Sequence, residues 1–120
     1  MKRNYFLTGS SGREILIVEF EDKSLESLSE FLIFESSKFG QLILENLNSL
    51  LEGIIENYSF SGNLLDADCH VDQVVITHLF DDDLPASKIS TREFYDLIIE
   101  YNEFNLRTKQ GILELPIDIS

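Results

Sequence analysis

The sequence has 120 residues, of which 22 are Asp or Glu and nine are Lys or Arg, so its formal net charge is -13 at pH 7. A surface this acidic repels the phosphates of nucleic acids and anionic membranes, which excludes both as natural partners and favours basic protein surfaces. Nine Phe and four Tyr in a 43% apolar composition can form a core, so we expect one folded domain over residues 1–120.

The start of the chain predicts no membrane segment. No apolar stretch of the signal-peptide type follows Lys2 and Arg3, and no apolar run approaches the ~20 residues needed to span a bilayer. The single cysteine, Cys69, excludes an intrachain disulfide and suits a reducing compartment. We therefore expect a cytoplasmic protein.

The first half of the chain predicts one strand and two helices. Residues 14–20 follow a Gly-Ser-Ser-Gly turn and are rich in β-branched side chains, which is typical of a strand. Residues 24–35 have helical apolar spacing, although the continuous apolar run at 31–34 leaves a strand as the alternative. Residues 38–57 carry the clearest apolar stripe and predict a central helix, with Ser36 or Ser37 as its cap.

Residues 64–80 predict a β-hairpin. If Asp72 and Gln73 form the turn, Cys69 faces Ile76 and one side of the hairpin is almost wholly apolar. The other side carries Asp66, Asp68 and His70 beside Val75, Thr77 and Leu79. Because Asp-Gln is not a favoured tight-turn pair, a longer loop is the alternative.

The last third predicts a turn, a helix and an edge strand. Residues 81–85 are typical of a turn, and Ser90 with Glu93 forms a capping box at the start of a helix over 90–107. Residues 112–119 suggest a final strand, which Pro116 places at a sheet edge. The whole is an α+β fold, in which two or three helices pack on a small, mostly antiparallel sheet.

The Asp-rich strand raises the question of a metal site. Asp66, Asp68, His70 and Asp72 alternate along one strand and point the same way, whereas Cys69 points to the opposite face. A closed zinc shell therefore cannot converge here, and no CxxC or HxxxH spacing occurs. An oxygen-rich Mg²⁺ or Ca²⁺ site is the alternative, but the spacing is not that of an EF-hand. We expect a solvated strand face with no metal and no cofactor.

Nucleophilic catalysis receives little support from the residues. Cys69 cannot use His70, because adjacent strand residues face opposite sides, and only His78 could lie diagonal to it on the apolar face. Burial on that face would raise the thiol pKa and disfavour the reactive thiolate. The turn at 9–12 lacks the Lys and spacing of a phosphate-binding loop. We expect a non-enzyme with no catalytic residue.

A family pattern runs from Leu64 to Phe104. It contains a hairpin ending in Val-Val-Ile-Thr-His-Leu-Phe at 74–80, the acidic turn Asp-Asp-Asp-Leu-Pro at 81–85, and a Ser-capped helix with an aromatic residue near its end. This order resembles the C-terminal half of immunity proteins from bacterial contact-dependent growth inhibition and related polymorphic toxin systems. The resemblance covers about a third of the chain and implies one-to-one neutralisation of a cognate toxin C-terminal domain, often a nuclease. No catalytic residue is implied.

The acidic side chains are the candidate contacts for such a toxin. A nuclease presents a basic cleft, and an acidic inhibitor would associate quickly with it and could cover it. The toxin-binding candidates are Asp66, Asp68, His70, Asp72, Asp81, Asp82 and Asp83. Two other hypotheses stay open: a small metal-dependent enzyme that uses the Asp-rich strand, and a structural or adaptor subunit that pairs through an exposed sheet edge.

Overall fold

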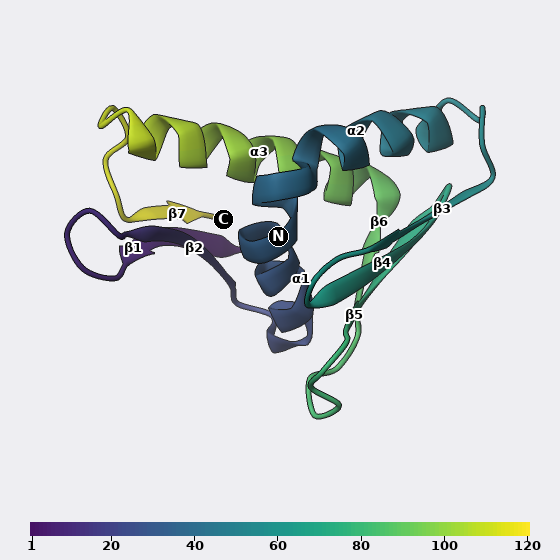
Figure 1. Ribbon diagram of the computed structural model, residues 1–120, viewed down its shortest axis with the longest axis horizontal. Helices are drawn as coiled ribbons and strands as arrows, with labels where there is room; N and C mark the ends of the chain where they lie inside the picture. The colour runs from purple at the N-terminus through teal and green to yellow at the C-terminus, as the bar shows by residue number, and fades with distance from the viewer.

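A computed structural model describes residues 1–120 and has an α+β fold, as the sequence predicts (Figure 1). Its strands form two antiparallel sheets rather than one. The strands are β1 (Arg3–Thr8), β2 (Ile15–Phe20), β3 (Asn57–Ser61), β4 (Leu65–His70), β5 (Gln73–His78), β6 (Ser87–Ser90) and β7 (Ile117–Ile119). The helical elements are the 3₁₀ turn η1 (Lys23–Leu25), α1 (Glu26–Phe31), the π-helical turn η2 (Leu32–Ser36), α2 (Ser37–Leu51) and α3 (Thr91–Lys109).

The smaller sheet has the strand order β2-β1-β7. Alternate residues of β1 and β2 face inward, so that Tyr5 and its partner Val18 are both fully buried. The expected turn at residues 9–12 joins the two strands, and Gly9 adopts a φ of 107° that side-chain-bearing residues rarely adopt. The final strand is shorter than predicted, but it lies at a sheet edge as Pro116 indicates.

The larger sheet has the strand order β3-β4-β5-β6. The predicted hairpin forms its centre with the expected faces, but the register differs by two residues. Cys69 pairs with Val74 rather than Ile76, because Val71 and Asp72 form the turn instead of Asp72 and Gln73. A shift of two residues keeps each side chain on its predicted face, so the apolar pattern is satisfied equally well in both registers.

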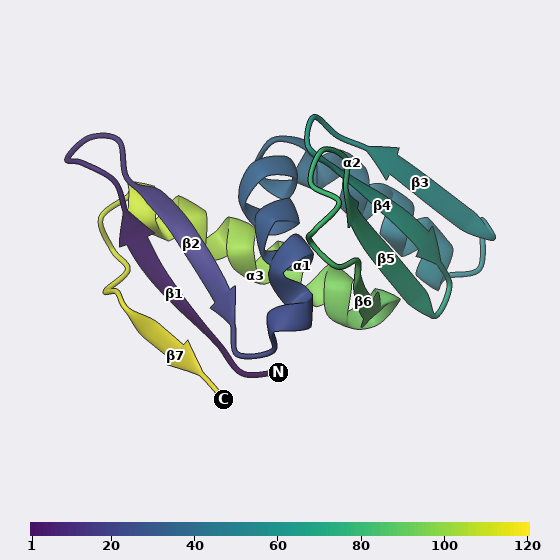
Figure 2. The same cartoon turned by 90° about the horizontal axis from the view of Figure 1, so that it is seen from below.

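The helices bind the two sheets into one body. Helix α1 lies between them, and α3 runs behind both, contacting β2 at one side and β5 and β6 at the other (Figures 1 and 2). Helix α2 packs on α3 and β3. A single cluster of 23 buried apolar residues results, in which Phe31 makes an edge contact with Phe60 and a tilted contact with Phe94.

The two helices predicted over residues 24–35 and 38–57 differ from expectation at their ends. The segment 24–35 is helical rather than a strand, and it runs through η2 directly into α2. Ser36 and Ser37 therefore cannot act as caps, and their hydroxyls donate instead to Leu32 O and Ile33 O, each four residues earlier. Helix α2 ends at Leu51 rather than near residue 57, because Gly53 takes a left-handed φ of 77°.

The capping box is confirmed at the start of α3. Ser90 Oγ accepts the Glu93 N–H at 3.1 Å and donates to Glu93 Oε1 at 2.9 Å. No helix in the structure is both long and apolar enough to cross a lipid bilayer.

Candidate protein-binding face

The predicted acidic side chains of β4 lie on the outer face of the larger sheet. Leu65, Ala67 and Cys69 are buried, and the alternate residues Asp66, Asp68 and His70 face the other way. The strand pairing on either side of β4 extends this face with small or polar side chains. Asp66 lies between Ser61 and Thr77, and Asp68 lies between Ser59 and Val75. The outer face therefore carries mostly polar side chains, and Asp68, His70 and Thr77 on it are exposed to solvent.

Asp66 is less open than its neighbours on this face. Asp68 and His70 are exposed, whereas Asp66 is half-buried and its Oδ1 is covered without accepting a hydrogen bond. A covered carboxylate oxygen without a donor is unfavourable.

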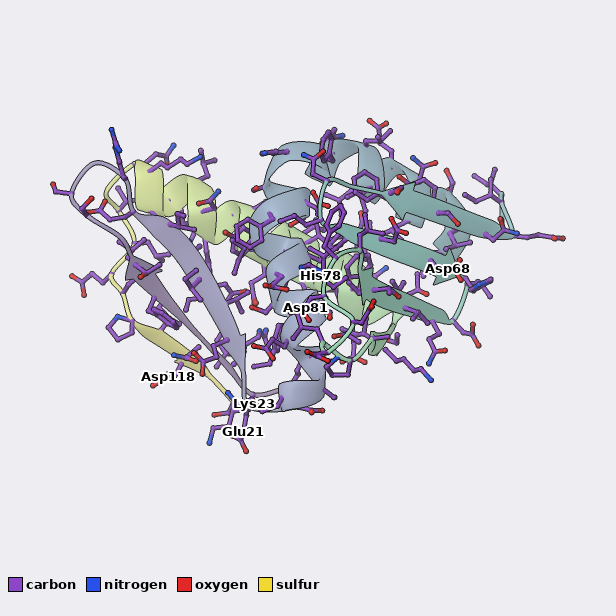
Figure 3. The ribbon with its side chains drawn as sticks, turned by 60° about the horizontal axis from the view of Figure 1, so that its bottom comes forward. Glu21, Lys23, Asp68, His78, Asp81 and Asp118 are labelled. Atoms are coloured by element: carbon purple, nitrogen blue, oxygen red, sulfur yellow. The ribbon has the colours of Figure 1, made fainter.

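The remaining candidates lie in two loops at opposite ends of the sheet. Asp72 is in the β4–β5 turn, and Asp81 to Asp83 follow the far end of β5, which is six residues long. At about 3.3 Å per residue, the two groups are about 20 Å apart. Figure 3 shows Asp68 on the sheet and Asp81 apart from it, beside His78. The seven candidates therefore form an extended surface rather than one compact site.

The six aspartates of this surface carry charge that the protein does not neutralise. None of them forms an ion pair with Lys or Arg, and their only contact with a basic side chain is Asp68 Oδ2 with His70 Nε2 at 3.4 Å. The nearest Lys or Arg in the same cross-strand row as Asp68 is Lys88, which lies two strands away. At ~4.8 Å between strands, their backbones are about 10 Å apart. The negative potential of the surface therefore reaches into solvent.

His78 fixes the start of the acidic loop. Its Nδ1 accepts the N–H of Phe80 at 3.1 Å and the N–H of Asp81 at 3.0 Å. Its Nε2 faces Glu30 Oε2 of α1 at 3.7 Å, and the His78 side chain is only 12% exposed. Figure 3 shows His78 and Asp81 close together beside α1. By accepting both N–H groups, the His78 ring holds the backbone at the start of the acidic loop in place.

Phe80 is a surface residue that the sequence pattern misplaces. In the register expected from the sequence it faces Leu65 on the apolar side, but β5 ends at His78 and the Phe80 side chain is 74% exposed. His78 takes the place opposite Leu65 instead. The signal that could have identified Phe80 is its position directly before three aspartates, which end the apolar alternation.

Cys69 lies in surroundings unsuited to nucleophilic chemistry. It is 0% exposed, and burial, with a smaller contribution from the nearby Asp68 charge, raises the pKa of its thiol to about 12. His78 is not diagonal to Cys69. It lies four residues beyond Val74, the partner of Cys69, at a distance of about 13 Å along the strand.

Neither the metal-ligating side chains nor the surface hollows indicate a functional site other than the acidic surface. No group of three or more His, Cys, Asp or Glu side chains converges in a way that could hold a metal ion. The largest hollow, about 610 Å³, lies beside η1 and β6 and contains none of the predicted site residues. Its charged lining is mixed in sign, and Lys2 is already paired there with Glu21 at 3.2 Å. No protein-family model, curated protein or solved structure matches the chain, so the interpretation depends on this geometry.

Proposed function

We propose that this chain is an immunity protein, which binds a cognate toxin C-terminal domain one-to-one and neutralises it, the toxin being a nuclease with a basic cleft. The observation that carries the proposal is the set of six aspartates on one sheet face and its two end loops, none of which has a Lys or Arg partner. Removing such charges from water is favourable only when cationic groups replace the water.

The scaffold supports tight association. Asp66 and Asp68 stand on β4, which is paired on both sides, and the loop of Asp81 to Asp83 is held by His78, so binding there requires little ordering of the backbone. The uncompensated negative charge would speed encounter with a basic cleft, and the pattern of charges would reject unmatched partners.

The separation of the carboxylates favours protein binding over metal-dependent catalysis. A metal site needs three or more ligands around one point, whereas Asp72 and the Asp81–Asp83 loop lie about 20 Å apart along β5. A protein surface can engage both ends of such a face, since a standard interface covers about 800 Å² of each partner.

The test uses the C-terminal domain of the secreted protein encoded directly upstream of this chain, inactivated and purified separately. We expect a one-to-one complex with nanomolar or tighter Kd by calorimetry, and a Kd that rises as salt is added. In a separate assay with the active domain, we expect addition of this protein to abolish the nuclease activity. Absence of such an upstream protein, or absence of binding to its C-terminal domain, contradicts the proposal. Binding that is independent of salt contradicts the electrostatic part of it.

Two control measurements address the other hypotheses. If the chain were a metal-dependent enzyme, Mg²⁺, Mn²⁺ or Ca²⁺ would raise its Tm and EDTA would lower it. If it were an adaptor subunit that pairs through a sheet edge, sedimentation would show an oligomer whose mass increases with concentration. The proposal expects neither effect.

A further inference from the structure

Phe80 is the most exposed large apolar residue of the protein. Its side chain is 74% exposed, and Leu79 beside it is 38% exposed. A lone exposed apolar residue is common on protein surfaces, but here it stands directly before the three exposed aspartates Asp81, Asp82 and Asp83. Interfaces commonly bury an aromatic ring at their centre and place charged residues at the rim, and the sequence order of Phe80 and the three aspartates is compatible with such an arrangement.

The exposure of Phe80 does not come from a loose loop. Its N–H is held by His78 Nδ1, and the preceding N–H of Leu79 donates to Leu64 O at 2.8 Å. Further along the loop, Asp83 N–H donates to Asp81 Oδ1 at 3.1 Å, and Ser27 Oγ of α1 donates to Pro85 O at 2.9 Å. The loop is therefore tied to β4, β5 and α1 on both sides of the ring. A preordered aromatic group loses little conformational entropy when a partner covers it.

We propose that Phe80 is the apolar anchor of the toxin interface and inserts into an apolar pocket bordered by Lys or Arg side chains. This inference rests on the proposed function and adds to it the kind of surface that the partner presents. Charge complementarity selects the occupant, because the three unpaired aspartates that follow Phe80 in the chain would repel an acidic rim and attract a basic one.

The decisive variant is Phe80→Ala, tested against the same upstream-encoded toxin domain. We expect its Kd to rise by about 30-fold or more, mainly through faster dissociation, because truncating a central aromatic anchor removes a buried contact. We expect Phe80→Leu, which keeps most of the apolar volume, to lose less. Since the ring is 74% exposed in the free protein, the Tm of both variants should remain close to that of the wild type.

Matched controls are available on other surfaces. Ile54 and Ile112 are 69% and 68% exposed, close to the exposure of Phe80, and both lie outside the larger sheet and its acidic loop. We expect Ile54→Ala and Ile112→Ala to change Kd by less than about twofold. A second readout is chymotryptic cleavage after Phe80, which should be suppressed in the complex relative to the free protein.

The outcomes separate the two proposals. If the wild-type protein does not bind the toxin domain, the proposed function fails and this inference fails with it. If the wild type binds but Phe80→Ala binds within about threefold of it, or Phe80 stays open to chymotrypsin in the complex, only the assignment of Phe80 as the anchor is overturned.

Discussion

The carboxylate of Glu35 occupies the space into which a Cβ at Gly62 would project. Glu35 is 0% exposed and accepts N–H bonds from Asn63 at 3.2 Å, Leu64 at 3.1 Å and Leu65 at 3.1 Å. A Cβ built on Gly62 would collide with both Glu35 oxygens. The turn between β3 and β4 is therefore fastened to the π-helical turn by one buried acid, which also satisfies backbone groups that no strand pairs.

Gly62→Ala is expected to lower the free energy of unfolding by about 1–3 kcal/mol, because the added methyl group must push the Glu35 carboxylate away from its three donors. Urea denaturation followed by circular dichroism measures the change. Ser61→Ala is the matched control, since Ser61 is exposed and adjacent, and its replacement should cost less than about 0.5 kcal/mol. Equal stabilities of Gly62→Ala and Ser61→Ala would contradict the steric argument.

Glu100 makes a second, half-buried link, and its effect on stability depends on pH. Its carboxylate accepts hydrogen bonds from Arg3 Nε at 2.8 Å, Arg3 Nη2 at 2.7 Å and Tyr5 Oη at 2.5 Å. Burial alone would raise the pKa of Glu100, but the hydrogen bonds from Arg3 and Tyr5 and the charge of Arg3 together hold it below 4.5. The ionised carboxylate therefore stabilises the folded state fully above the unfolded pKa, and this contribution is lost as pH falls through the lower folded pKa.

Glu100→Gln should accordingly lower the free energy of unfolding by about 1–3 kcal/mol at neutral pH. The difference from the wild type should begin to shrink below about pH 4.5, where Glu100 of the unfolded chain binds a proton, and should continue to shrink until the pH falls through the lower folded pKa. Denaturation curves of both proteins at several pH values test this. Glu103→Gln, which breaks an exposed pair with Arg107, should have an effect below about 1 kcal/mol. A Glu100→Gln deficit that is constant down to acid pH would contradict the assignment.

The Cys69 thiol is expected to be inert while the protein is folded. It is 0% exposed and its pKa is raised to about 12, so both access and thiolate fraction are low. A disulfide reagent such as Ellman's reagent should react with native protein only as fast as it unfolds, and promptly in denaturant. Fast stoichiometric labelling under native conditions would reopen the possibility of a reactive thiol.

The acidic loop is expected to control the rate of association. Replacing Asp81, Asp82 and Asp83 with Asn should lower kon for the toxin domain about tenfold at low ionic strength and flatten its salt dependence. The Asn side chain at position 81 can still accept the Asp83 N–H, so the loop keeps its shape. The matched control replaces three exposed acids on or just after α2, Glu45, Glu52 and Glu56, with Gln. It makes the same change in net charge, and an equal loss of kon in both triple variants would contradict a local effect.

The buried and exposed faces of the hairpin could be predicted, because apolar and polar side chains alternate along its strands. The register was not, since a slip of two residues leaves Leu65, Ala67 and Cys69 on the same side. The position of the turn sets the register, because Val71 and Asp72 rather than Asp72 and Gln73 reverse the chain. The same slip moved Phe80 from the expected core to the surface.

Three strands had no readable signal in the sequence. β3 reads Asn-Tyr-Ser-Phe-Ser and lies at a sheet edge, so three of its five residues are Asn or Ser and only Phe60 is buried. β6 has four residues and buries Ser87 with Ile89, and β1 carries Arg3 on its inward face because Glu100 neutralises it there. In each case a tertiary partner, not local preference, makes the strand. The acidic candidates could be identified because charged residues are visible in the sequence. The hydrogen bonds by which His78 holds their loop could not be predicted, because they depend on spatial contacts.

Helix α3 packs against both sheets. Phe94 near its start is buried against Phe31, and further along Tyr101 donates to Leu16 O on β2 at 2.7 Å while Phe104 stacks edge-on against Tyr5. If either sheet unfolded alone, the apolar side chains on half of this helix would be exposed to water. The molecule should accordingly behave as a single cooperative unit, in which loosening the strands far from the acidic loop loosens the loop as well.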